Sequence, residues 1–259
     1  MGYYCGIDIG ASAAKLVIIG ADGSMVARAK KRSGVDYAQT ARELLEEAER
    51  GGAVDEKEMV RTVSTGYGRD NVPWADGKMT EIACHGKGAY HYFGEAMTVI
   101  DIGAQDSKVI HLDSSGRRER FKMNRKCAAG TGAFIEEIAY RLAIDVSEMN
   151  SLAEKSGCRV SLGSFCTVFA ATEVLEKIRS GCAVADIVRA AFESVVKRIV
   201  EMDMITGRLV LTGGVAGHNA CLARMLGEAF GTQASVVPDA QYAGATGAAL
   251  FAREQASEG

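Results

Sequence analysis

Short apolar runs separated by glycine turns dominate the first half of the chain. They predict strands at residues 3–9, 15–19 and 25–31, a helix at 37–50, a strand at 60–64, a helix at 80–93, and three more strands at 98–102, 107–112 and 118–123. The second half is mainly helical. Helices are expected there at 132–142, 146–155, 167–180, 184–204, 219–230 and 242–254, with strands at 209–212 and 235–237.

The strand pattern starts again near residue 98, and a short motif repeats with it. Asp8-Ile-Gly-Ala-Ser-Ala-Ala-Lys15 and Asp101-Ile-Gly-Ala-Gln-Asp-Ser-Lys108 match at Asp, Ile, Gly, Ala and Lys. Each copy lies between two apolar strands, so a duplicated unit is favoured over two unrelated hairpins, which remain the alternative. We therefore expect an α/β protein with two lobes, residues 1–95 and 96–259, and a cleft between them.

Composition narrows the functional classes. The 259 residues are 47% hydrophobic and carry a formal net charge of −3 with mixed signs, so no basic face invites nucleic acid or an anionic membrane. No apolar run approaches the roughly 20 residues that span a bilayer, and no signal-peptide pattern opens the chain. We expect a cytoplasmic protein without nucleic-acid or membrane partners.

The repeated hairpins have the chemistry of a phosphate site. A glycine after a strand brings backbone N–H groups close to an anion, and an aspartate at the strand end can hold hydrated Mg²⁺. We expect Asp8, Asp101 and Gln105 to be catalytic, with Gln105 and Asp106 able to orient an attacking water. The expected phosphate contacts are Gly10, Ser12, Ala13, Ala14, Lys15, Gly103, Ala104, Gln105 and Asp106. Neither the Walker loop nor the dinucleotide fingerprint is present.

A third glycine site joins a strand to a helix at Leu211-Thr-Gly-Gly-Val-Ala216. Bare backbone at such a turn lets a flat adenine or ribose lie against it, although a packing turn is the alternative. Residues expected to contact the nucleoside are Gly213, Gly214, Val215 and Asn219, with Gln241 and Gly244 closing the pocket. Plain glycine-rich helix packing is the alternative for the last two.

Seven cysteines occur, without a C-x-x-C pair, at positions 5, 84, 127, 158, 166, 182 and 221. An odd number without a signal peptide argues against a disulfide framework. Most are expected to be small buried hydrophobes. Cys127 and Cys166 each precede a predicted helix, whose unpaired N–H groups would stabilise a thiolate.

These motifs resemble a known superfamily. Asp8-Ile-Gly, Asp101-Ile-Gly and Thr212-Gly-Gly are similar to the two phosphate motifs and the adenosine motif of the acetate and sugar kinases, heat-shock chaperones and actin. That resemblance implies a two-lobed actin-like ATPase with duplicated ribonuclease H-like lobes. Ile100-Asp-Ile-Gly-Ala-Gln-Asp-Ser-Lys-Val-Ile110, Lys126-Cys-Ala-Ala-Gly-Thr-Gly132 and Cys166-Thr-Val-Phe-Ala170 resemble a narrower group. That group, the BadF/BadG/BcrA/BcrD ATPase family, contains the activator ATPases (component A) of 2-hydroxyacyl-CoA dehydratases and the ATPase subunits of benzoyl-CoA reductases.

Two positions depart from the pattern of this group. Ala104 stands where many members have a second glycine, and Ala11-Ser12 where many have Ser-Thr. Ser12 keeps a hydroxyl, so ATP binding is still implied.

The resemblance implies a homodimer in which Cys127 and Cys166 of both subunits hold one [4Fe-4S] cluster. Two cysteines cannot ligate such a cluster, which takes four, whereas two copies on a two-fold axis can. The alternative is an intrachain set of Cys127, Cys158, Cys166 and Cys182.

By the same resemblance, ATP binding and hydrolysis lower the potential of the cluster. The electron then passes to a 2-hydroxyacyl-CoA dehydratase, and a ferredoxin or flavodoxin supplies it. Three alternatives stay open: an ATPase subunit of a benzoyl-CoA reductase or an activator of another iron–sulfur enzyme, a small-molecule kinase of the same fold, and a non-catalytic nucleotide-binding scaffold.

Overall fold

The computed structural model describes residues 2–52, 54–124, 127–163 and 167–257. The chain separates into two compact units. The first unit contains Met1–Glu95, Ser114–Arg118 and Gln241–Gly259, and the second contains Ala96–Asp113 and Glu119–Ala240. Among the residues described, no helix is both long and apolar enough to cross a membrane.

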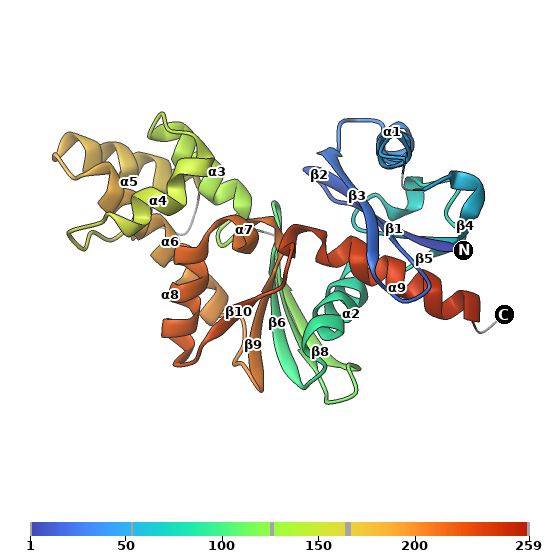
Figure 1. Cartoon of the computed structure of the whole chain (residues 1–259). Helices are drawn as coiled ribbons and strands as arrows, with labels where there is room; N and C mark the ends of the chain where they lie inside the picture. The colour runs from blue at the N-terminus through green and yellow to red at the C-terminus, as the bar shows by residue number, and fades with distance from the viewer. Residues whose placement is uncertain (1, 53, 125–126, 164–166, 258–259) are drawn as a thin grey trace. The chain divides into compact units, whose positions relative to one another are not determined.

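The first unit is built on a five-stranded sheet in the order β3-β2-β1-β4-β5 (Figure 1). Its strands are β1 (Tyr3–Ile9), β2 (Ala13–Ile19), β3 (Met25–Arg32), β4 (Met59–Thr65) and β5 (Gly77–Lys78). Strands β1, β2 and β3 form an antiparallel meander, whereas β4 pairs with β1 in parallel. The register sets Asp8 opposite Lys15 on one side and opposite Thr65 on the other.

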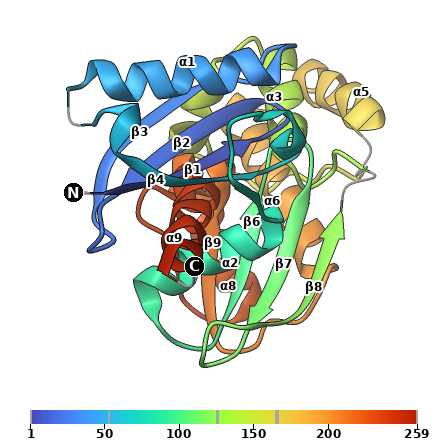
Figure 2. The ribbon, with the colours of Figure 1, turned by 90° about the vertical axis from the view of Figure 1, so that its right-hand side faces the viewer.

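Helices cover both faces of this sheet (Figure 2). They are α1 (Tyr37–Arg50), α2 (Glu81–Phe93) and α9 (Ala243–Ser257). Because strand side chains alternate between faces, Ile7 and Leu16 pack with Leu44 of α1, whereas Val17 packs with Ala245 of α9.

The second unit repeats this topology. Its strands are β6 (Met97–Ile102), β7 (Ser107–Leu112), β8 (Arg118–Asn124), β9 (Arg208–Thr212) and β10 (Ala234–Val236). Their order, β8-β7-β6-β9-β10, is that of the first sheet with each strand replaced by its counterpart. Asp101 lies opposite Lys108 and Thr212, as Asp8 lies opposite Lys15 and Thr65. The two-lobed, duplicated α/β fold expected from the repeat is confirmed.

The second unit differs from the first in what joins its third and fourth strands. Among the residues that the structure describes, α1 is the only α-helix between β3 and β4, whereas four stand between β8 and β9: α3 (Gly132–Arg141), α4 (Met149–Glu154), α5 (Thr167–Arg179) and α6 (Val184–Val200). They gather together in Figure 1. Strand β9 is followed by α7 (Gly213–His218) and α8 (Ala220–Phe230), and short 3₁₀ turns occur at Glu56–Glu58, Arg69–Asn71, Val146–Glu148 and Ala240–Tyr242.

The C-terminal helix, α9, belongs to a different unit from the one expected. Residues 96–259 were expected to form one lobe, but the structure groups Gln241–Gly259 with the first unit. Helix α9 is rich in alanine and glycine, so it approaches its neighbours closely. A Cβ added at Gly6 of β1 would collide with the Ala245 carbonyl, and one at Gly247 with the Cys84 carbonyl of α2.

Candidate functional site

The first hairpin closes a tight turn after β1. The Gly10 amide donates to the Ala13 carbonyl at 3.2 Å, and the Ser33 hydroxyl donates to the Gly10 carbonyl at 2.5 Å. Ser12 is exposed at the tip, whereas Ala14 is fully buried. The turn thus presents backbone and one hydroxyl, as a phosphate site requires.

The carboxylate of Asp8 lies beneath this turn with only 6% of the residue exposed. The Lys15 ammonium is 3.9 Å from its Oδ2 and donates to the Ala13 carbonyl at 3.2 Å. In the described part of the chain, Lys15 is the one ion-pair partner found for Asp8.

Gly66 and Gly244 of the same unit lie close to Asp8. A Cβ at Gly66 would collide with its Oδ1, and one at Gly244 would lie 3.0 Å from its Oδ2 and 3.0 Å from Nε2 of His85. The sequence analysis found Gly244 but missed Gly66 and His85. The sequence does contain a signal for Gly66. Thr65-Gly66 stands at the end of β4 as Thr212-Gly213 stands at the end of β9, its counterpart in the second unit.

The second hairpin has the same backbone but a different charge arrangement. Lys108 is 2% exposed, and its ammonium lies 3.0 Å from Asp101 Oδ2 and 2.6 Å from Asp106 Oδ1. The Gly103 amide donates to the Asp106 carbonyl at 2.9 Å, which closes the turn. Gln105 is exposed at the tip. The structure therefore brings together Asp101, Asp106 and Lys108, and leaves Gln105 open to a ligand.

The third glycine site meets this hairpin at Asp101. Gly213 has φ +89°, and a Cβ there would lie 2.5 Å from Asp101 Oδ1. The Thr212 hydroxyl donates to the same oxygen at 3.4 Å. Gly214 adds no side chain, so the start of α7 presents bare backbone.

Other expected nucleoside contacts are engaged within the protein. The side-chain amide of Asn219 donates to the Val215 carbonyl at 2.8 Å. Gln241 accepts from the Lys30 ammonium at 3.0 Å in the first unit, where Gly244 also lies. The expected pocket of Gly213, Val215, Asn219, Gln241 and Gly244 stays a prediction.

The loop from Cys127 to α3 is bonded directly to the second hairpin. The Gly132 and Ala133 amides, at the start of α3, donate to the Gly103 and Ala104 carbonyls at 2.9 and 2.8 Å. The buried Ser107 hydroxyl donates to the Gly130 carbonyl at 2.5 Å. Three hydrogen bonds therefore connect this loop and helix to the hairpin.

The Cys127 end of this loop is held from β8. The Asn124 side-chain amide donates to the Cys127 and Ala129 carbonyls, both at 3.1 Å. Cys127 itself is half-buried and its thiol is free. The backbone around this cysteine is thus held in place.

The remaining cysteines divide by burial. Cys5, Cys84 and Cys221 are buried, and burial raises the pKa of all three thiols, that of Cys84 to about 12. These three are packing residues, as expected. Cys158 is exposed, Cys182 is half-buried, and Cys166 falls outside the described residues. Within the described residues, no group of three or more His, Cys, Asp or Glu is placed to hold a metal ion.

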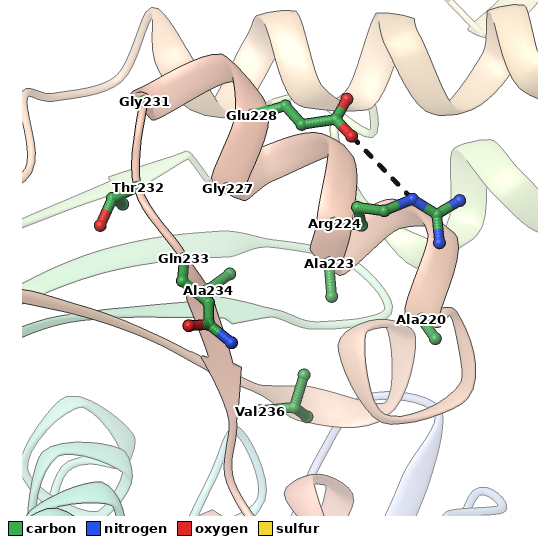
Figure 3. A pocket seen from close by; sticks show the side chains of 10 residues that line it. All are labelled: Ala220, Ala223, Arg224, Gly227, Glu228, Gly231, Thr232, Gln233, Ala234 and Val236. Carbon is green, nitrogen blue, oxygen red and sulfur yellow. Dashed lines mark ion pairs between the residues drawn. The ribbon is translucent and has the colours of Figure 1, made fainter.

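An open groove of about 620 Å³ lies elsewhere in the second unit (Figure 3). It runs between α8 and the edge strand β10, and the Arg224–Glu228 ion pair of α8, at 4.0 Å, lies on it. None of the hairpin or glycine-loop residues lines it. It is therefore separate from the candidate site.

The contact of Gly213 with Asp101 generates a stability prediction. Gly213→Ala places a Cβ at positive φ against a buried carboxylate, so the free energy of unfolding should fall by about 2–3 kcal/mol. Gly214→Ala is the matched control, because nothing lies within 4 Å of its added Cβ, and it should change stability by less than about 0.5 kcal/mol. Urea unfolding followed by circular dichroism measures both, and equal losses would contradict the assigned contact.

Known proteins of one family are similar to this chain. The model of the BadF/BadG/BcrA/BcrD ATPase family matches residues 5–252. The chain is 38% identical to the (R)-2-hydroxyglutaryl-CoA dehydratase activating ATPase of Acidaminococcus fermentans, over 99% of each chain. It is also 38% identical to the 2-hydroxyisocaproyl-CoA dehydratase activator of Clostridioides difficile, over 99% of this chain and 97% of the relative.

Solved structures of such proteins share the fold. The crystal structure of component A of the A. fermentans dehydratase superposes with a TM-score of 0.94 at 38% identity, covering 99% of this chain and 100% of that one. The C. difficile activator with bound ADPNP gives 0.93 at 37% identity, covering 99% and 96%. The fold is thus that of the two-lobed actin-like ATPases, and the chain belongs to the BadF/BadG/BcrA/BcrD ATPase family.

Proposed function

We propose that this chain is an ATP-driven one-electron reductase that activates a 2-hydroxyacyl-CoA dehydratase. Two relatives at 38% identity, aligned over almost their whole length, are named as activators of such dehydratases. A third, the activator of lactoyl-CoA dehydratase from Anaerotignum propionicum, is 38% identical over 99% of both chains. The electron donor in this proposal is a ferredoxin or flavodoxin, and the working unit is a homodimer.

ATP and Mg²⁺ would be held by the two hairpins. The tight turns at Gly10 and Gly103 leave backbone amides for phosphate oxygens, and Lys15, partly exposed, supplies a positive charge. Asp8 is a carboxylate whose ion pair with Lys15 is long, at 3.9 Å, which suits a hydrated Mg²⁺. In this proposal Asp8 and Asp101 support the metal and the exposed Gln105 orients the attacking water.

A [4Fe-4S] cluster would be held by Cys127 and Cys166 of two subunits. The free, half-buried thiol of Cys127 suits a ligand at a subunit surface, and one chain offers too few of the proposed ligands to complete the cluster. When bound, the cluster supplies the one-electron chemistry. The chain's own part is to position the thiols and to change their surroundings when nucleotide binds.

The observation that carries this proposal is the bonding between the second hairpin and the Cys127 loop. The Gly103 and Ala104 carbonyls accept hydrogen bonds from the start of α3, and Ser107 bonds the Gly130 carbonyl. A change at the hairpin on nucleotide binding or hydrolysis therefore reaches the loop through three hydrogen bonds. Gly130, at φ +81°, is a position where the loop can turn.

A second candidate is the ATPase component of a benzoyl-CoA reductase. One of the benzoyl-CoA reductase subunits of Thauera aromatica is 30% identical over 95% of this chain. The lower identity ranks this candidate second. A small-molecule kinase would explain the hairpins but gives no reason for the bonded Cys127 loop.

An anaerobic activation assay tests the proposed function. Purified chain, MgATP and a reduced ferredoxin or flavodoxin should switch on a 2-hydroxyacyl-CoA dehydratase, and omission of any one should leave it inactive. Asp8→Ala should lower ATP hydrolysis at least about 100-fold, because it removes support for the metal that neutralises phosphate charge. ATP-dependent phosphorylation of a small molecule, with no dehydratase activation, would favour the kinase instead.

Iron stoichiometry tests the shared cluster. Anaerobically purified protein should contain about four iron per two chains, and Cys127→Ala should remove them. Cys158→Ala and Cys182→Ala are the controls and should keep the iron, because neither belongs to the proposed ligand set. About four iron per single chain, or iron loss in either control, would favour the intrachain set.

Ser107→Ala tests the coupling path. Loss of its hydrogen bond to the Gly130 carbonyl removes about 1 kcal/mol, equivalent to about 40 mV for one electron. We expect iron content and ATP hydrolysis to persist, while the difference in midpoint potential between ADP and a non-hydrolysable ATP analogue shrinks by about that amount. Ser151→Ala, an exposed serine bonded to the Glu148 carbonyl of its own turn, is the control. An unchanged difference in Ser107→Ala would exclude this hydrogen bond from the path.

A further inference from the structure

The two hairpins have equivalent backbones, but the lysine of each one is paired differently with carboxylates. Lys15 is partly exposed and lies 3.9 Å from Asp8, a distance at which the pair is loose. Lys108 is almost completely buried and contacts two carboxylates, Asp101 at 3.0 Å and Asp106 at 2.6 Å. Equivalent positions in a duplicated fold thus hold one loosely paired lysine and one enclosed lysine.

The Lys108 ammonium occupies the place that a divalent cation would take. Oxygens from two carboxylates converge on it, and converging carboxylate oxygens are the ligands that Mg²⁺ and Mn²⁺ prefer. Asp101 is 2% exposed and also accepts from Thr212, so its position is fully defined by the protein. Without the lysine, the buried Asp101 and the partly exposed Asp106 would lose the ammonium that lies between them.

Removing the lysine from this group of buried charges would change the protonation or the cation binding of the carboxylates. A buried charge that loses its counter-charge is destabilised, so it takes up a proton or another cation. Asp8 has no second carboxylate in contact among the described residues, so the loss of Lys15 would leave a single charge in a more open place. The two lysines are therefore a matched pair for experiment.

We propose that Lys108 is a positioning residue that acts as a tethered cation. It holds Asp101 and Asp106 in place and keeps divalent metal off them in the absence of nucleotide, so metal enters the site only together with a polyphosphate. This proposal rests on the proposed function in one respect, which is that the polyphosphate is ATP. The exclusion of free metal follows from the ion-paired geometry alone.

Nucleotide-free Mn²⁺ binding tests this inference, with free Mn²⁺ counted by room-temperature electron paramagnetic resonance on the full-length protein. The wild type should show no binding at the Asp101–Asp106 pair. Lys108→Met should gain one Mn²⁺ site, with affinity at least about tenfold above the wild type. Lys108→Met combined with Asp106→Asn should lose that site again. Lys15→Met, the matched control, should gain none.

The outcomes separate the alternatives. A folded Lys108→Met that gains no Mn²⁺ site, or an equal gain in Lys15→Met, overturns the proposal. If Lys108→Met does not fold, Lys108→Gln replaces it. If that also fails, the wild type alone decides: nucleotide-free Mn²⁺ binding that Asp106→Asn abolishes overturns the proposal, and its absence supports it. Failure of the wild type to bind MgATP would overturn the proposed function but leave these outcomes unchanged.

Discussion

Each unit depends on a carboxylate placed against a glycine where two parallel strands end. The pairing of β1 with β4 sets Asp8 opposite Thr65, and that of β6 with β9 sets Asp101 opposite Thr212. The glycine that follows each threonine has φ near +86° or +89°, and in both cases an aspartate oxygen and a strand carbonyl stand where a Cβ would be. Only glycine tolerates both conditions. The hairpins, the glycine loops and the depth of the carboxylates all follow from this contact.

The second unit adds its distinctive chemistry where the chain leaves its sheet. Strand β8 ends at Asn124, whose amide holds the Cys127 and Ala129 carbonyls, and α3 then begins against the hairpin carbonyls. A Cβ at Gly132 would lie 3.2 Å from the Ala104 Cα, so a glycine there lets the helix come this close. Helix α3 is therefore joined to the hairpin by backbone hydrogen bonds, which fix its position more rigidly than contacts of long side chains would.

The sequence predicted the described strands other than the two-residue β5, the repeat and both hairpins, because period-two alternation and glycine turns are local signals. It did not predict that α9 packs with the first sheet, since an alanine-rich helix carries no local mark of the sheet it will cover. The proximity of His85 to Gly244 was not predicted either, because it joins segments far apart in the chain. The burial of Lys108 was equally hidden, since lysines are ordinarily exposed.

Because the fold is duplicated, the two hairpins can be compared position by position. Their backbones and registers are equivalent, so both present amides and a carboxylate in the same geometry. The two motifs differ at three positions, and one of these lies two residues before the lysine: Ala13 in one hairpin and Asp106 in the other. Lys108 donates to that additional carboxylate, whereas Lys15 donates to the Ala13 carbonyl. The position two residues before the lysine is thus where the charged surroundings of the two lysines diverge.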